Sequence, residues 1–452
     1  MRSLAAFAAF VVLALVPAGC RTTATDADVA PRLDALFRDL HERGLFDGAV
    51  VVANADRIVW EHGIGFANAE RQVRFTPDTP ADGASLAKTF TAALVLGLQA
   101  QGKLDLDAPA RRLLPELPYP EITLRHLLSH SSGIPVLDYD YFDKLIPPDR
   151  IRTTEGLLAV IAEQNPPLAF EPGTAFEYSS FGYDLAALAA GRAAGKPYAE
   201  LLHERFFQPL GIDSAFVRPG RLSAFPGIRT LGYRRDSGTL VLNEVFDFEG
   251  FHGGSNIYIS ARDLHQWNAS LFDKAPPLAL QFARIDNHPS GLTLGSWYRT
   301  DDGSAFWYSG HLQGFHSEVF RDVRSRRSIV YVSNNTIEPW MQKGVIRAVS
   351  AILDGHDSRP LMPPATDDVR KEERESLAGA WVLPDGTTFT IENSSGRIDV
   401  RQKEVRYRMV QISPRAFYVP GLDWMIGFAR DSNSFDRIHV ESNVREQWGQ
   451  RQ

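Results

Sequence analysis

The sequence has 452 residues, of which 44% are hydrophobic, and it carries a formal net charge of −7. That length is enough for a large catalytic domain together with a smaller domain. The mild negative charge, without a basic patch interleaved with aromatic residues, argues against a nucleic-acid partner. Because the chain holds one cysteine, Cys20, it cannot form an intramolecular disulfide.

The first 20 residues have the pattern of an export signal. Arg2 precedes an uncharged run over residues 4–16, which is too short to span a bilayer and fits the apolar region of a signal peptide. The small residues before Cys20 resemble a bacterial lipobox, in which the cysteine is lipidated and becomes the mature N-terminus. We therefore predict a lipoprotein-type signal peptide over residues 1–20, a tether over 21–30 and a membrane-anchored envelope protein. Pro17 departs from the aliphatic residue usual at its position and leaves ordinary secretion open.

The following segments predict one helix and a strand meander. Apolar residues spaced three and four apart over residues 33–40 indicate a helix that ends near Gly44. Residues 48–53 and 57–62 are β-rich runs separated by a polar turn, which is typical of a hairpin. The meander continues through residues 63–67.

The helix predicted from residue 84 to about residue 98 holds the first candidate catalytic pair. Apolar residues cover nearly its whole circumference, so the helix should be buried. Lys88 lies three residues after Ser85, so both side chains leave the same helical face. A buried lysine beside a hydroxyl is an arrangement that activates a serine nucleophile. The alternative is a serine that caps the helix beside a lysine that extends into solvent.

Two histidines on the next short helix have the spacing of a helical metal pair. His126 and His130 are four residues apart, but no glutamate follows the first and no third ligand is evident. We therefore interpret both as structural and expect no metal site.

The rest of the chain predicts a helical middle followed by strands. Helices are expected over residues 183–191, 198–209 and 342–353, with a serine-capped helix beginning at residue 260, and strands over residues 305–309, 318–320 and 328–332. Strands at both ends around a helical middle predict an α+β fold, in which an antiparallel sheet is flanked by helices and carries an all-helical subdomain. We place this domain at residues 31–356, a proline-rich and charged linker at 357–376, and a small all-β domain at 377–452.

Several motifs in this order resemble one family. They are Ser85-Leu86-Ala87-Lys88, residues 126–133 (HLLSHSSG), Pro172-Gly173 before Tyr178-Ser179-Ser180, residues 209–212 (PLGI), Gly253-Gly254 before residues 260–264 (SARDL), and residues 310–314 (GHLQG). Together they resemble the penicillin-recognising serine hydrolases, which include class C β-lactamases, DD-peptidases, D-aminopeptidases and related esterases. The all-β domain resembles the lipocalin-like or barrel domains appended to some of these hydrolases.

The resemblance implies roles for individual residues and requires no cofactor. Ser85 would be the acylated nucleophile, Lys88 would share its proton, and Tyr178 would act as base and then as acid toward the leaving group. The backbone N–H groups of Ser85 and Gly314 would form the oxyanion hole.

Three residues depart from the family pattern, and we expect them to contribute to substrate binding. Ser180 replaces an asparagine, and its hydroxyl would contact Lys88 or the substrate. His311 replaces the lysine of class C β-lactamases, so it would offer little positive charge to a substrate carboxylate. Gln313 stands where a glycine normally lets the substrate approach the strand.

These features predict an envelope-associated serine hydrolase that forms an acyl-enzyme with a small-molecule or peptide substrate. D-amino-acid peptides and carboxylic esters are equally compatible with the motifs, and β-lactam hydrolysis is a further alternative. A catalytically silent binding or sensor protein on the same fold is disfavoured by the intact Ser85, Lys88 and Tyr178. A metal-dependent hydrolase is disfavoured because the twelve histidines form no compact ligand cluster in the sequence.

Overall fold

The structure is a computed structural model, and its described part comprises thirteen ranges of the chain. These are residues 26–135, 152–236, 239–243, 249–271, 281–283, 292–300, 302–335, 339–358, 361–394, 397–403, 405–430, 434–443 and 445–452. Cys20 and the predicted signal peptide lie outside them, so the lipid anchor stays a prediction. Within these ranges, no helix combines the length and the apolar character needed to cross a membrane.

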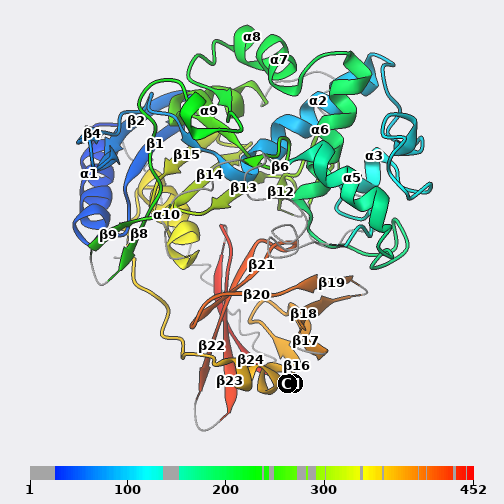
Figure 1. The fold of residues 1–452 in the computed structure, drawn as a ribbon. Helices are drawn as coiled ribbons and strands as arrows, with labels where there is room; N and C mark the ends of the chain where they lie inside the picture. Colours follow the sequence, from blue (N-terminus) through cyan, green and yellow to red (C-terminus); the bar gives the residue numbers. More distant parts are fainter. Residues whose placement is uncertain are drawn as a thin grey trace, which may run out of the picture.

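A six-stranded antiparallel sheet forms the centre of the hydrolase domain, with strand order β12-β13-β14-β15-β1-β2 (Figure 1). Its strands are β1 Gly48–Asn54, β2 Arg57–Ile64, β12 Tyr298–Arg299, β13 Ala305–Leu312, β14 Phe315–Asp322 and β15 Arg327–Ser333. β1 pairs with β15, placing Val51 opposite Val330, so strands from distant parts of the sequence lie side by side. The predicted α+β fold with an antiparallel sheet is confirmed.

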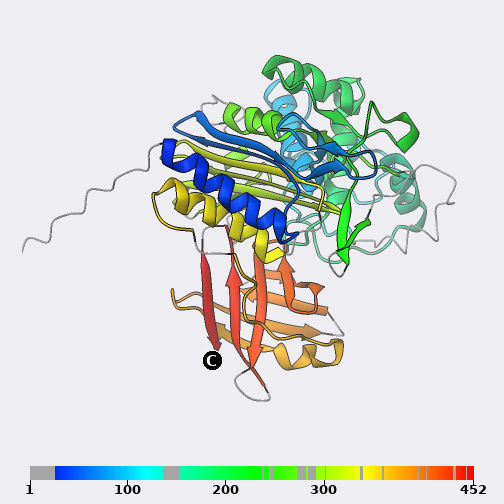
Figure 2. The same cartoon turned by 90° about the vertical axis from the view of Figure 1, so that its left-hand side faces the viewer.

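Helices cover both faces of this sheet. α1 (Asp26–Glu42) and α10 (Pro339–Leu353) lie side by side on one face (Figure 2). α9 (Ala261–Ser270) packs against β1, β14 and β15 on the other face. Ser260 caps α9 by accepting a hydrogen bond from the Asp263 backbone N–H, as the sequence predicted.

The helical subdomain surrounds the helix that follows Ser85. Its helices are α2 Ala87–Ala100, α3 Leu124–Leu128, α5 Thr154–Gln164, α6 Ser180–Ala194, α7 Tyr198–Leu202 and α8 Gln208–Leu210, with a π-helical turn at His203–Phe207. α2 packs against α6, and its Phe90 stacks on Trp267 of α9 with ring centroids 4.2 Å apart. Burial around nearly the whole of α2 therefore matches its uniformly apolar sequence.

Short strands complete the described hydrolase domain and hold its connecting segments in place. They are β3 Phe66–Asn68, β4 Val73–Arg74, β5 Ala81–Asp82, β6 Arg152–Thr153, β7 Phe216–Val217, β8 Tyr233–Asp236, β9 Thr239–Leu242, β10 Glu249–Gly250 and β11 Ile257–Ile259. β5 pairs with β11 immediately before Ser85. This pairing fixes the chain at the point where it enters the candidate site.

The C-terminal residues form a near-barrel of nine strands beside the hydrolase domain (Figure 1). The strands are β16 Gly379–Val382, β17 Thr388–Ser394, β18 Arg397–Gln402, β19 Val405–Arg408, β20 Val410–Ser413, β21 Ala416–Val419, β22 Trp424–Arg430, β23 Phe435–Glu441 and β24 Glu446–Arg451. The predicted linker ends in a 3-10 helix, Lys371–Leu377, and Asp367 and Val369 donate backbone hydrogen bonds to Phe428 and Pro414 of the barrel. The predicted division into two independently folding units stays a prediction.

Candidate active site

Ser85 lies in a tight turn immediately before α2. It belongs to a 3-10 turn, Ala84–Leu86, and the Ala84 N–H donates to Asp82 Oδ1 over 2.8 Å. Ala84 has φ +48°, a left-handed conformation that is strained for a residue with a side chain. The N-cap of α2 is Leu86, and no side chain caps the helix. Ser85 is therefore not a capping serine, and its hydroxyl is available for other contacts.

Lys88 is fully buried and does not extend into solvent. Its Nζ donates to Ser85 Oγ at 3.1 Å, to Ser180 Oγ at 3.1 Å and to the Gly254 carbonyl oxygen at 2.7 Å. Three acceptors match the three protons of an ammonium group, which allows the charge to be buried. The predicted contact between Ser180 and Lys88 is present.

Tyr178 completes the arrangement around the serine. Its hydroxyl donates to Ser85 Oγ over 3.1 Å, and Lys88 Nζ lies 5.0 Å from the centroid of its ring. Burial raises the pKa of Tyr178, but the charge of Lys88 and the hydrogen bonds to the phenol oxygen outweigh burial, so the net pKa is below its ordinary value. A lowered pKa favours the ionised form of Tyr178, and a phenolate next to Ser85 Oγ can accept the serine proton.

His130 supports Tyr178 from behind. The two rings stack with centroids 4.5 Å apart, and His130 Nδ1 accepts the Ser179 backbone N–H over 3.1 Å. His126 caps its own short helix, because its Nδ1 accepts the Thr123 backbone N–H. These contacts agree with the structural role predicted for both histidines. Within the described ranges, no cluster of three His, Cys, Asp or Glu side chains could hold a metal ion.

Tyr308 on β13 is a site residue that the sequence analysis missed. Its hydroxyl lies 3.2 Å from that of Tyr178. Burial raises the pKa of Tyr308 well above its ordinary value, so this phenol stays protonated and can donate to Tyr178. Tyr308 lies in a strand that the sequence predicted, but nothing local signals that it faces Tyr178.

Gly310 of β13, and not Gly314, lies against the turn that carries Ser85, which differs from the predicted position of the oxyanion glycine. A Cβ at Gly310 would lie 2.3 Å from the Gly83 carbonyl oxygen and 3.2 Å from Ala84 Cβ, so only glycine allows this approach. Gly314 instead lies in the turn between β13 and β14, at φ +66°, against Gly232 and Asn243. Its neighbour Gln313 is exposed in the same turn and does not lie in the strand as predicted.

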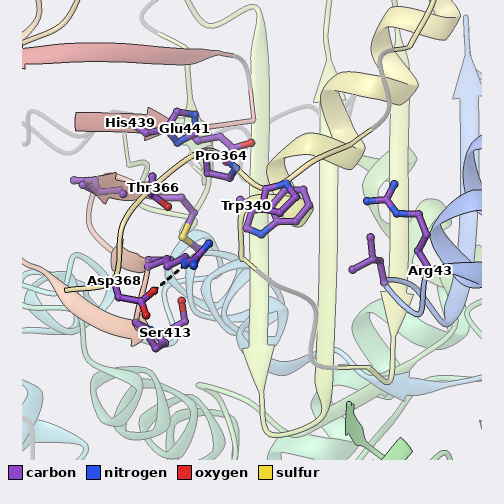
Figure 3. Close-up of a pocket in the computed structure, with 16 residues that line it drawn as sticks. Arg43, Trp340, Pro364, Thr366, Asp368, Ser413, His439 and Glu441 are labelled. Atoms are coloured by element: carbon purple, nitrogen blue, oxygen red, sulfur yellow. Dashed lines mark hydrogen bonds and ion pairs between the residues drawn. The ribbon is translucent and has the colours of Figure 1, made fainter. Parts of the chain in front are cut away.

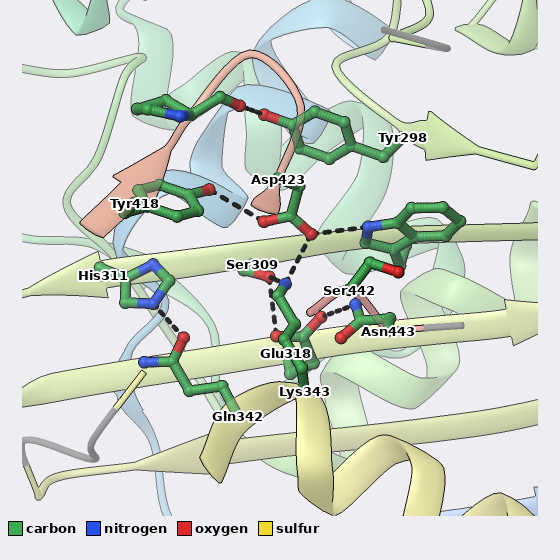
Figure 4. Close-up of polar contacts among 12 residues, drawn as sticks. Tyr298, Ser309, His311, Glu318, Gln342, Lys343, Tyr418, Asp423, Ser442 and Asn443 are labelled. Atoms are coloured by element: carbon green, nitrogen blue, oxygen red, sulfur yellow. Dashed lines mark hydrogen bonds and ion pairs between the residues drawn. The ribbon is translucent and has the colours of Figure 1, made fainter. Parts of the chain in front are cut away.

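His311 also differs from its predicted position, because its side chain points to the opposite face of β13. Successive side chains of a strand alternate between faces, and Tyr308 and Gly310 occupy the face toward Ser85. His311 is hydrogen-bonded to Gln342 of α10 and packs against Tyr418 of the barrel, with ring centroids 5.6 Å apart (Figure 4). The residue as a whole is exposed, but desolvation of its ring among these neighbours lowers the pKa of the imidazole.

The backbone N–H of His311 remains well placed at the open edge of β13. Ser304 O accepts the Val323 N–H, so Ser304 and every second residue from it have their backbone polar groups toward β14. His311 belongs to the other set, and in the described ranges the register of β12 with β13 covers Phe306 and Trp307 and does not reach His311. Its N–H therefore points to the unpaired strand edge, one residue beyond Gly310 and next to the turn that carries Ser85.

A separate cavity of about 440 Å³ lies between the hydrolase domain and the barrel (Figure 3). Trp340, Pro364, Thr366, Met425 and Glu441 are among the residues that line it. None of the lining residues is Ser85, Lys88, Tyr178 or Tyr308, so this cavity is distinct from the candidate active site.

Comparison with known proteins gives a consistent assignment. Residues 33–352 match the family model described as Beta-lactamase. Penicillin-binding protein 4* of Bacillus subtilis is 26% identical over 424 residues, which cover 88% of this chain and 93% of that protein. Esterase EstB of Burkholderia gladioli is 34% identical over 210 residues, covering 42% and 52% of the two chains. The octameric penicillin-binding protein homologue from Pyrococcus abyssi has the same fold, with 20% identity, a TM-score of 0.63, and coverage of 94% of this chain and 100% of that chain.

Proposed function

This chain belongs to the beta-lactamase family of serine hydrolases, and we propose that it cleaves neutral carboxylic esters through an acyl-enzyme on Ser85. The observation that carries this proposal is the convergence of Lys88 Nζ and the Tyr178 hydroxyl on Ser85 Oγ, each at 3.1 Å. We further propose an envelope or extracellular location, supported by the likeness to a bacterial penicillin-binding protein, with anchoring through Cys20.

In the proposed acylation step, Ser85 Oγ forms a bond to the ester carbonyl carbon. Ionised Tyr178 takes the serine proton and then transfers it to the departing alcohol oxygen as the ester bond breaks. Lys88 keeps its positive charge beside both oxygens, and Tyr308 donates a hydrogen bond to the Tyr178 oxygen while that oxygen is negative. In deacylation, a water oxygen forms a bond to the acyl carbon while Tyr178 takes a proton from that water. The bond between Ser85 Oγ and the acyl carbon then breaks, Tyr178 transfers the proton to Ser85 Oγ, and the carboxylic acid product leaves.

The developing oxyanion would be bound by the backbone N–H groups of Ser85 and His311. The second donor replaces the predicted Gly314, and its support is the position of His311 at the open strand edge beside Gly310. Such donors act mainly on the transition state, because the negative charge that they stabilise develops only there.

This assignment predicts that His311→Pro lowers kcat by on the order of a hundredfold, because proline lacks the donating N–H. His311→Ala keeps that N–H and serves as the matched control, with kcat expected within a few-fold of wild type. Steady-state kinetics of both variants on one ester provide the measurement. Equal losses of kcat in the two variants would show that the imidazole matters and that the backbone donor does not.

The preference for neutral substrates follows from Tyr308, which occupies the strand position facing Tyr178. A protonated phenol offers no charge to a substrate carboxylate, whereas a lysine at this position would provide one. We therefore propose weak recognition of substrate carboxylates on the basis of Tyr308, whereas the sequence interpretation placed this property at His311.

The expected result is that wild type hydrolyses a neutral acyl ester at least roughly tenfold better than its matched partner with a free carboxylate, about 1.4 kcal/mol in kcat/KM. Tyr308→Lys should narrow this ratio. His311→Lys should leave it unchanged, because that side chain lies on the far face of β13. The measurement is kcat/KM for the substrate pair at pH 8. A wild-type preference for the carboxylate substrate would contradict the neutral-ester proposal.

A further inference from the structure

The turn between β21 and β22 of the C-terminal barrel is buried against β13, the strand that carries Tyr308 and His311 (Figure 4). Asp423 in this turn is fully buried, and its Oδ2 accepts the Trp307 indole N–H over 2.7 Å. The same oxygen accepts Lys343 Nζ of α10 at 2.5 Å, and Oδ1 accepts the Tyr418 hydroxyl at 2.9 Å. One barrel carboxylate therefore joins β13, α10 and the hairpin itself.

Hydrogen bonds connect the ion pair between Lys343 and Asp423 to further residues of β13 and β14. Lys343 is fully buried, and its Nζ donates to Ser309 Oγ over 2.8 Å. Ser309 in turn donates to Glu318 Oε2 over 2.7 Å, and burial raises the pKa of Glu318 to about 7. The Asp423 carboxylate compensates the charge of buried Lys343, so the loss of Asp423 would leave that charge poorly compensated and disturb the contact of Lys343 with Ser309.

Each residue on the back of β13 between positions 307 and 311 has its own anchor. Trp307 is held by Asp423, Ser309 by Lys343, and His311 by Gln342 and the Tyr418 ring. The front of the same segment carries the Tyr308 hydroxyl and the close approach of Gly310 to the turn before Ser85. The buried anchors of Trp307 and Ser309 therefore determine how far the front lies from Ser85.

A second line of contacts leads from the serine to the same turn. Ser85 contacts the Tyr178 hydroxyl, which contacts that of Tyr308. Tyr308 stacks on Tyr298 with ring centroids 5.8 Å apart, and the Tyr298 hydroxyl donates to the Pro420 carbonyl oxygen. Both faces of β13 are thus connected to the barrel turn.

We propose that Asp423 is a positioning residue of the active site, through which the barrel holds the Tyr308–His311 segment in register with Ser85. This inference rests on the proposed function of Ser85 and His311. An oxyanion donor is effective only within a fraction of an ångström of its productive position. The all-β domain then contributes to catalysis by positioning β13.

The test is a comparison of Asp423→Asn with Glu441→Gln. Glu441 forms an ion pair between the barrel and Arg347 of α10, but in the described structure no hydrogen bond or ion pair joins it to β13 residues 307–311. Asp423→Asn should lower kcat about tenfold to a hundredfold with little change in KM. Glu441→Gln should lower the melting temperature and leave kcat near the wild-type value.

A double-mutant cycle with His311→Pro separates positioning from general stability. If Asp423 acts by placing the His311 N–H, Asp423→Asn should have little further effect on kcat once that N–H is gone. Additive losses, or an equal kcat for Asp423→Asn and Glu441→Gln, would overturn the proposal. Tyr418→Phe, which removes one hydrogen bond to Asp423, replaces Asp423→Asn if that variant does not fold, with a several-fold kcat loss and the same non-additivity expected. Retention of turnover by Ser85→Ala would instead refute the proposed function itself.

Discussion

Ser85→Ala should reduce ester turnover by on the order of a millionfold, which is the scale expected when a catalytic serine nucleophile is removed. The side chain does not cap α2, and in the described part of the chain its hydroxyl forms hydrogen bonds with Lys88 and Tyr178. The free energy of unfolding should therefore change by about 1 kcal/mol or less. Turnover and thermal unfolding of the same preparation provide the measurement.

Ser260→Ala is the matched control for this substitution, because Ser260 does cap a helix. It should cost about 1 kcal/mol of stability and leave turnover unchanged. Turnover by Ser85→Ala within about a hundredfold of the wild-type rate would contradict the role of Ser85.

Lys88→Ala should lower kcat by on the order of a thousandfold or more, because it removes the charge that favours both the Tyr178 phenolate and the Ser85 alkoxide. The pH dependence gives a second signature. The charge of Lys88 lowers the pKa of Tyr178, and activity is lost as the pH falls through that pKa. Without Lys88 the pKa of Tyr178 rises, so the acidic limb of residual activity should move to higher pH.

The measurement is a pH–rate profile of kcat for wild type, Lys88→Ala and Lys88→Arg. Arginine keeps the charge but cannot reproduce the geometry of one nitrogen with three acceptors. Lys88→Arg should therefore have an acidic limb close to that of wild type, while its kcat stays well below the wild-type value. An acidic limb that stays in place in Lys88→Ala would show that Tyr178 is not the group titrating there.

The fold and the first half of the site could be predicted because their signals are local. The apolar circumference of the helix after Ser85 indicated its burial, and the three-residue spacing placed Lys88 beside the serine. Tyr178 was recognisable from the motif around it. All three lie together in the structure.

The glycine of β13 that lies beside the nucleophile turn could not be identified from the sequence, because its position depends on strand register. Gly310 and Gly314 lie four residues apart, and either could be the glycine nearest the nucleophile in a linear pattern. The turn at residues 313–314 and the pairing of Leu312 with Phe315 decide between them. A different register would reverse the face of every side chain, including that of His311.

The contact between the barrel and β13 could not be predicted from the sequence either. Asp423 follows Trp307 by 116 residues, and only the tertiary structure brings the carboxylate to the indole. Ending the chain within the predicted linker, near Pro364, would leave buried Lys343 without Asp423. A hydrolase fragment ending there should then be less stable than the full chain.

The most direct test of the account is the site of covalent labelling by a fluorophosphonate. The wild-type protein is labelled, digested and analysed by peptide mass spectrometry, with Ser85→Ala treated in parallel. A single adduct on Ser85, absent from the variant, is the predicted result. An adduct on another residue, or undiminished labelling of Ser85→Ala, would contradict the assignment of Ser85 as the nucleophile.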